Sequence, residues 1–110
     1  ILSDVTGYLV GGLGLLPSGN IGDYHALFEP VHGSAPDIAG RDTANPIAAM
    51  RSAAMLLAYA GDKESSVLIE QAIGNTLASG IRTRDLGGTC GTKDFSKKVC
   101  NELIALLKCV

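Results

Sequence analysis

The sequence predicts an α/β fold whose 110 residues are mostly helical and include one clear strand. Four segments carry helix start and stop signals, whereas His25 to Val31 reads as a strand, with Pro30 indicating a sheet edge or a strand exit. One strand and four helices do not make a self-sufficient sheet. The chain also starts on Ile-Leu-Ser-Asp without an initiator Met. We therefore expect residues 1–110 to be the C-terminal portion of a longer domain, whose missing N-terminal part supplies most of the strands.

The N-terminal stretch is predicted to be a short helix followed by a loop. The helix runs from Asp4 to about Val10, with Ser3 as its N-cap and Gly11-Gly12 at its end. Residues 13–23 are expected to form a loop, because proline, serine, glycine and asparagine are frequent there.

The second predicted helix is strongly apolar. Asn45-Pro46 reads as an N-cap followed by proline at the first helical position, and the helix runs to Ala60 before Gly61. Arg51 is its one charged residue. A helix without a polar face is expected to be buried in a core or an interface.

Two further helices are predicted. Asp62 caps the third, which Gly80 ends, and Thr92 caps the fourth after a glycine-rich loop over residues 81–91. The fourth helix is amphipathic, and we expect five of its apolar side chains to face inward: Phe95, Val99, Leu103, Ile104 and Leu107.

Composition argues against several function classes. The formal charge of −2 comes with no basic block, which gives no support to a nucleic-acid or membrane-surface role. No apolar run reaches the ~18 residues of a membrane-spanning helix. The three cysteines form no C-x-x-C pair, so we expect reduced thiols and an intracellular compartment.

The most informative segment is residues 28–40, which read Phe-Glu-Pro-Val-His-Gly-Ser-Ala-Pro-Asp-Ile-Ala-Gly and lead to Asn45-Pro46. A strand here enters a loop of small residues that holds one imidazole, His32, and one carboxylate, Asp37. Small residues let a flat polar ligand lie against the backbone while a few side chains read it.

This segment closely resembles the adenine-nucleotide loop of the β-decarboxylating dehydrogenases, which include isocitrate, homoisocitrate, 3-isopropylmalate and tartrate dehydrogenases. The resemblance extends from Ile1 to about Lys108. It implies that the chain is the C-terminal part of an isopropylmalate dehydrogenase-like two-domain fold. It also implies a cytoplasmic location in a bacterium, or the mitochondrial matrix in a eukaryote.

The resemblance implies a set of cofactor-binding residues, which are Glu29, His32, Gly33, Ser34, Ala35, Asp37, Ile38 and Asn45. The matching histidine and the backbone after it contact the adenosine, Asn45 matches a residue that pairs with adenine, and Glu29 one that approaches the nicotinamide end. Each has a simpler reading from sequence: a surface histidine, a helix cap, and an exposed charge at a strand end.

Asp37 bears on the choice between NAD and NADP. A carboxylate can accept both ribose hydroxyls of NAD, but it would repel the 2′-phosphate of NADP. The simpler reading is an ordinary turn aspartate after Pro36. Many NADP users of the resembling family carry Lys-Tyr where this chain has Asp37-Ile38, so the resemblance indicates NAD.

Asp4 is the one candidate metal ligand. Oxygen ligands suit Mg²⁺ or Mn²⁺. In the resembling family a Gly-Asp-x-x-Ser-Asp motif brings two carboxylates toward the metal, and here the first would lie one residue before Ile1. The alternative is a cap-region charge in a first helical turn.

The activity implied for the full-length protein is oxidation of the C2 hydroxyl of a small 2-hydroxy acid by hydride transfer to NAD⁺, with loss of the β-carboxylate. No catalytic residue is expected in this segment, so the fragment by itself should be inactive. The resemblance also implies a homodimer or a hetero-oligomer of related subunits, formed through the helix that follows the metal motif.

Residues 82–88 and 92–95, Arg-Thr-Arg-Asp-Leu-Gly-Gly and Thr-Lys-Asp-Phe, look most like NAD-dependent isocitrate dehydrogenase of the tricarboxylic acid cycle. Homoisocitrate dehydrogenase remains an alternative, because it shares the 29–34 segment. 3-Isopropylmalate dehydrogenase is a second alternative, although such enzymes often carry Ser-Ala-Ser near residues 17–22. A non-catalytic regulatory subunit of a heteromeric enzyme is a further alternative, against which the intact cofactor loop argues.

Overall fold

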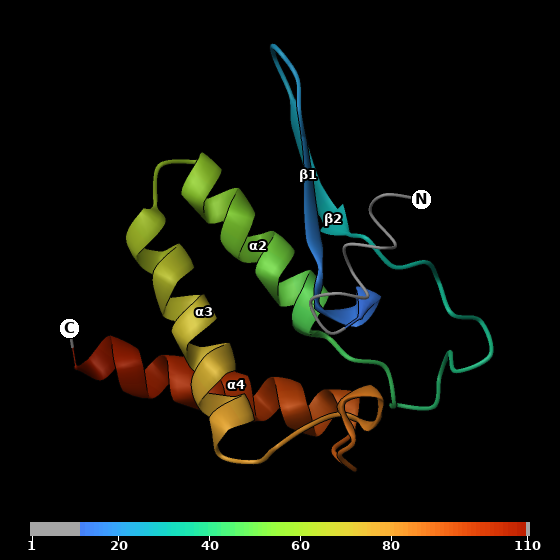
Figure 1. Ribbon diagram of the computed structural model, residues 1–110. Helices are drawn as coiled ribbons and strands as arrows, with labels where there is room; N and C mark the ends of the chain where they lie inside the picture. The colour runs from blue at the N-terminus through green and yellow to red at the C-terminus, as the bar shows by residue number, and fades with distance from the viewer. Residues whose placement is uncertain (1–11, 110) are drawn as a thin grey trace.

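The computed structural model describes residues 12–109, which form a β-hairpin and three α-helices (Figure 1). In chain order these are a 3₁₀ turn η1 (Leu13–Leu15), β1 (Pro17–Ile21), β2 (Ala26–Pro30), α2 (Ile47–Tyr59), α3 (Lys63–Ala78), a 3₁₀ turn η2 (Arg84–Leu86) and α4 (Thr92–Lys108). The helix predicted from Asp4 to Val10 lies outside the described residues. None of the described helices is long and apolar enough to cross a membrane.

The hairpin corrects the prediction of a loop over residues 13–23. β1 pairs antiparallel with β2, Pro17 opposite Pro30 and Ile21 opposite Ala26. Gly19 lies opposite Phe28, and a Cβ on this glycine would come within 3.0 Å of the phenylalanine ring. The ring therefore has room to lie across β1, and its centroid is 5.5 Å from that of Tyr59 on α2. The strand was missed because its sequence, Pro-Ser-Gly-Asn-Ile, has the composition of a turn.

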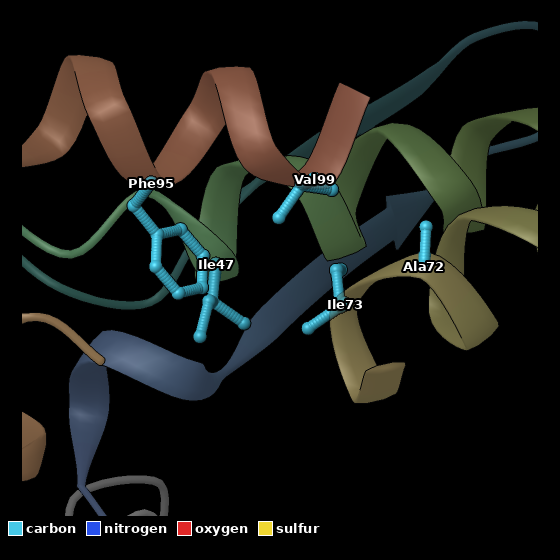
Figure 2. Close-up of a cluster of buried hydrophobic side chains, with 5 residues drawn as sticks. All are labelled: Ile47, Ala72, Ile73, Phe95 and Val99. Atoms are coloured by element: carbon cyan, nitrogen blue, oxygen red, sulfur yellow. The ribbon is translucent and has the colours of Figure 1, made fainter. Parts of the chain in front are cut away.

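The core lies where the three helices meet. α2 and α3 run side by side, and α4 passes across their ends (Figure 1). The buried cluster joins all three helices, and Figure 2 shows the ring of Phe95 and the side chain of Val99 directed from α4 toward its other members. The cluster consists of Ile47, Ala72, Ile73, Phe95 and Val99. Burial of these side chains fixes the start of α2 against α4, which matters for the site described below.

Helix boundaries follow the predicted signals closely. The Asp62 carboxylate caps α3 by accepting a hydrogen bond of 3.0 Å from the backbone N–H of Ser65. Hydrogen bonds from the side chain and the backbone of Ser65 hold the pKa of Asp62 below its usual value of 3.8. Gly61 and Gly80 have φ values of 101° and 90°, the left-handed conformation that ends a helix at glycine.

The burial prediction for α4 was wrong at two of its five residues. On α4, Ile104 and Leu107 are half exposed, while Leu103 and Leu106 pack against the core. At 100° per residue, Leu106 projects about 20° from Phe95 around the helix and Ile104 about 180°, so the helical period places Leu106 inward. The apolar helix α2 is buried at Ile47, Ala48, Ser52 and Ala54, as expected for a core helix, whereas Leu56 is 49% exposed in this chain.

Candidate functional site

A cavity of about 480 Å³ opens beside the segment that joins β2 to α2. Figure 1 shows this segment looping away from the three-helix body before it returns to the start of α2. Six of the eight residues predicted to bind the cofactor line the cavity: His32, Gly33, Ser34, Ala35, Ile38 and Asn45. Five others complete the wall: Gly14, Ala39, Thr43, Ala44 and Asp85. The volume lies in the range of small-molecule sites.

Consecutive turns give the loop its shape. The backbone N–H of Ile38 donates to the carbonyl oxygen of Ala35 at 3.1 Å, and that of Arg41 donates to the carbonyl oxygen of Ile38 at 3.2 Å. Ala35 has a φ of 42° and Gly40 a φ of 78°. An alanine in the left-handed region is strained, and such residues concentrate where the surrounding structure holds a binding loop.

His32 lines the cavity, and one nitrogen of its ring has a hydrogen-bond partner. Its Nδ1 lies 2.8 Å from the carbonyl oxygen of Gly33. Because a carbonyl can only accept, Nδ1 carries the proton in this contact. In the neutral ring Nε2 is then left as an acceptor. The sequence therefore supplies one imidazole acceptor at the entrance of the loop, next to glycine and serine residues that leave the backbone open.

Asn45 lies at the other end of the segment, with its amide oriented by two partners. Its Oδ1 accepts the backbone N–H of Ile47 at 2.9 Å, and its Nδ2 donates to Oδ2 of Asp85 at 3.0 Å. α2 begins at Ile47, one residue later than predicted, but the Asn45 side chain still satisfies a backbone donor at the start of the helix.

The end of the loop is anchored on α4. The backbone N–H of Thr92 donates to the carbonyl oxygen of Asp42 at 3.0 Å, and that of Lys93 donates to the Asp42 carboxylate at 2.9 Å. Asp42 thus caps α4 from a distance in sequence, which corrects the prediction that Thr92 is the N-cap. The Thr92 hydroxyl instead donates to the carbonyl oxygen of Ala44 at 2.5 Å.

A glycine makes this anchor possible. A Cβ on Gly91 would lie 2.6 Å from Oδ2 and 3.0 Å from the carbonyl oxygen of Asp42, closer than a Cβ approaches an oxygen atom without displacement. Asp42 itself has a φ of 56°. The C-terminal end of the loop is therefore held twice, by α2 through Asn45 and by α4 through Asp42.

Two predicted cofactor residues are not on the cavity wall. Glu29 is exposed on β2, opposite Ser18, and Asp37 is exposed on the loop beside the wall residue Ile38. Asp4, the predicted metal ligand, lies outside the described residues. Within residues 12–109, no group of three or more His, Cys, Asp or Glu side chains could hold a metal ion.

Sequence reasoning missed Asp85 and Thr43. Asp85 is 40 residues from Asn45 in the chain and reaches the cavity because η2 turns it back toward α2. Thr43 Oγ1 is buried and has no hydrogen-bond partner among the described atoms. Buried hydroxyls normally have a hydrogen-bond partner, so an unpartnered one on a cavity wall is consistent with a polar ligand in this cavity.

Comparison with known proteins identifies the relatives of the chain. A sequence model described as isocitrate/isopropylmalate dehydrogenase matches residues 1–99. The isocitrate/homoisocitrate dehydrogenase of Thermus thermophilus is 58% identical over 106 residues, covering 96% of this chain and 32% of that protein. The probable NAD isocitrate dehydrogenase subunit alpha, mitochondrial, of Caenorhabditis elegans is 52% identical, covering 91% of this chain and 28% of that protein.

A solved structure agrees with the sequence comparison. The beta-decarboxylating dehydrogenase of Thermococcus kodakarensis, in its apo form, superposes with a TM-score of 0.90 at 48% identity, covering 97% of this chain and 32% of that one. The chain spans about a third of the length of the relatives it matches. The predicted isopropylmalate dehydrogenase-like fold is thereby confirmed for this segment, and the chain belongs to the isocitrate/isopropylmalate dehydrogenase family.

Proposed function

We propose that the whole protein is an NAD-dependent isocitrate dehydrogenase, to which this chain contributes the adenine-nucleotide part of the cofactor site. The observation that carries the proposal is the cavity of about 480 Å³ beside the β2–α2 segment, with six predicted cofactor residues on its wall. Membership of a dehydrogenase family supplies the reaction class, and the cavity supplies a place for the cofactor.

The polar groups on the wall suit adenine. Asn45 keeps one N–H donor beyond its bond to Asp85, and a His32 ring that is protonated at Nδ1 alone offers an acceptor at Nε2. Adenine has ring nitrogens that accept and an exocyclic amino group that donates. Gly33 and Ser34 let a nucleotide approach the backbone closely, and the Thr43 hydroxyl is an unused polar group nearby.

Asp37 favours NAD over NADP in this proposal. The carboxylate is exposed beside the cavity, where a ribose joined to a bound adenine could reach it. Its charge attracts ribose hydroxyls and repels a phosphate at the 2′ position. A relative from Caenorhabditis elegans that bears NAD in its name supports the same choice. When bound, the nicotinamide accepts the hydride, and the residues of this chain hold the opposite end of the cofactor.

Isocitrate is the proposed substrate, with homoisocitrate and 3-isopropylmalate as alternatives, since relatives of the chain carry those names. The deciding experiment uses the full-length protein with NAD⁺, a divalent cation and each of the three acids in turn, and measures NADH formation. A kcat/KM that is highest for isocitrate supports the proposal. Turnover of another acid in its place would assign the alternative, and binding of NAD⁺ without turnover of any acid would indicate a regulatory subunit.

The proposals for a metal site and for a subunit interface depend on residues outside the described part of the chain. We propose that Asp4 contributes one carboxylate to a Mg²⁺ or Mn²⁺ site and that the following segment pairs with a second subunit. Asp4→Asn in the full-length protein should raise the cation concentration needed for half-maximal activity and leave NAD⁺ affinity unchanged, because it removes one charge from the ion's surroundings. An unchanged cation requirement with a lower melting temperature would leave Asp4 a helix-start residue.

A further inference from the structure

The orientation of the Asn45 amide is determined by groups that can each play one hydrogen-bonding role. The Ile47 N–H can only donate, so it must face Oδ1, and the Asp85 carboxylate accepts, so it faces Nδ2. With Oδ1 and one N–H engaged, the second N–H of Asn45 is the group left for the cavity. Without Asp85, the Ile47 bond by itself would leave the amide less constrained.

Asp85 is itself held in place. The hydroxyl of Thr83, a fully buried residue, donates to Oδ1 of Asp85 at 2.6 Å, while Oδ2 accepts from Asn45. The two carboxylate oxygens therefore join a buried residue to a wall residue of the cavity. The backbone of η2 supports this arrangement, since the N–H groups of Leu86 and Gly88 donate to the carbonyl oxygen of Thr83.

The space between η1 and the hydrogen-bonded pair of Asp85 and Asn45 is also limited. A Cβ on Gly14 would lie 3.1 Å from Oδ2 of Asp85 and 3.6 Å from Nδ2 of Asn45. The chain thus places a residue without a side chain where η1 faces the Asp85–Asn45 pair. Asp85 is otherwise exposed, and both members of the pair belong to the wall of the same cavity.

We propose that Asp85 is a positioning residue for purine recognition, which acts by holding the Asn45 amide with one N–H donor directed to the cofactor. The inference rests on the proposed function, because it assigns to the same cavity a residue that sequence reasoning did not identify. Asp85 need not touch the cofactor in this role. Its contribution passes through Asn45, and this makes it separable by experiment from a direct contact.

The test is a double-mutant cycle on the full-length protein, with NAD⁺ affinity measured by calorimetry and melting temperature measured alongside. Asp85→Ala should weaken NAD⁺ binding about three- to tenfold, the value of one ordinary hydrogen bond, and leave kcat nearly unchanged. Asn45→Ala should weaken it at least as much. The double variant should bind within about twofold of Asn45→Ala, because Asp85 has nothing to position once the amide is gone.

A conservative variant and a matched control complete the design. In Asp85→Asn the amide oxygen can still accept from Asn45 and the amide nitrogen can face the Thr83 hydroxyl, so binding should return to within about twofold of wild type. Asp94→Ala removes an exposed carboxylate on the first turn of α4 that does not line the cavity, and should leave NAD⁺ affinity unchanged.

The outcomes separate the two proposals. If the wild-type protein binds NAD⁺ and the losses of Asp85→Ala and Asn45→Ala add in the double variant, the positioning role is overturned while the proposed function stands. The positioning role is also overturned, and the proposed function again stands, if Asp85→Ala binds NAD⁺ as tightly as the wild-type protein does. A folded full-length wild-type protein that binds no NAD⁺ would overturn the proposed function and this inference with it.

Discussion

The double variant Asp37→Lys, Ile38→Tyr reverses a charge beside the cavity and should shift the cofactor preference of the full-length enzyme from NAD⁺ towards NADP⁺. Asp37 is exposed, and within residues 12–109 it has no ion-pair partner, so Asp37→Lys should change stability by no more than about 0.5 kcal/mol. Ile38 is half buried on the wall and joins the turns of the loop through its backbone. Ile38→Tyr therefore keeps those turns and adds a hydroxyl next to the ribose.

The expected magnitude follows from the exposure of Asp37. Loss of a charge-assisted hydrogen bond to ribose, at the weak end of its range because water reaches the site, costs about 1.5 kcal/mol for NAD⁺. A surface pair between lysine and the 2′-phosphate gains up to about 1 kcal/mol for NADP⁺. Together these change the ratio of kcat/KM values by about seventyfold in favour of NADP⁺.

Steady-state assays with each cofactor at saturating substrate measure this ratio. Asp94→Lys makes the same charge change on an exposed turn of α4 away from the cavity wall and serves as the control. We expect the control to leave the ratio within about twofold of wild type, since Asp94 is exposed to solvent and does not line the cavity. A ratio that the Asp37→Lys, Ile38→Tyr variant leaves unchanged would refute the assignment of Asp37 as the residue that reads the ribose.

Two stability predictions concern glycine positions and a helix cap, and both use melting curves of the full-length protein. Gly88→Ala should destabilise by about 2 kcal/mol or more, because its Cβ would lie 2.0 Å from the carbonyl oxygen of Arg82. Gly74→Ala on α3, where a Cβ meets open space, should stabilise by about 0.5–1 kcal/mol, and equal effects of the two changes would contradict this reading. Asp62→Ala should lower the melting temperature at neutral pH through loss of the α3 cap. Ser65 lowers the pKa of Asp62 in the folded state, so the stabilisation by the cap is present above pH 3.8 and is lost as the pH falls through the lowered pKa. The difference in melting temperature between Asp62→Ala and wild type should therefore shrink at low pH. A difference that stays constant with pH would show that the carboxylate charge plays no part.

Local signals predicted the helical part of the fold well. Asp62, Gly61 and Gly80 each act over one helical turn, so their roles can be read from neighbouring residues. The strand β1 could not be read in this way, because its pairing with β2 and the space that Gly19 leaves for Phe28 decide its conformation. A four-residue connection containing Gly22 between two five-residue segments was the signal available for a hairpin.

The candidate site was predicted where its residues are contiguous. Residues 32–35 and Ile38 of the loop line the cavity from one short stretch of sequence, and the resemblance of this stretch to a nucleotide loop indicated its role. Asp85 and Asp42 were missed because their partners, Asn45 and the start of α4, are 40 or more residues away in the chain. Such contacts depend on how α4 and η2 pack against the start of α2, and a single sequence carries no direct signal for them.

The structure of the full-length protein with NAD⁺ bound tests the central claim most directly. We predict that the adenosine occupies the cavity between His32 and Asn45, with the Asn45 amide still bonded to Asp85 and the ribose hydroxyls within hydrogen-bond distance of the Asp37 carboxylate. An adenosine bound elsewhere on the protein, with this cavity left to solvent, would contradict the account.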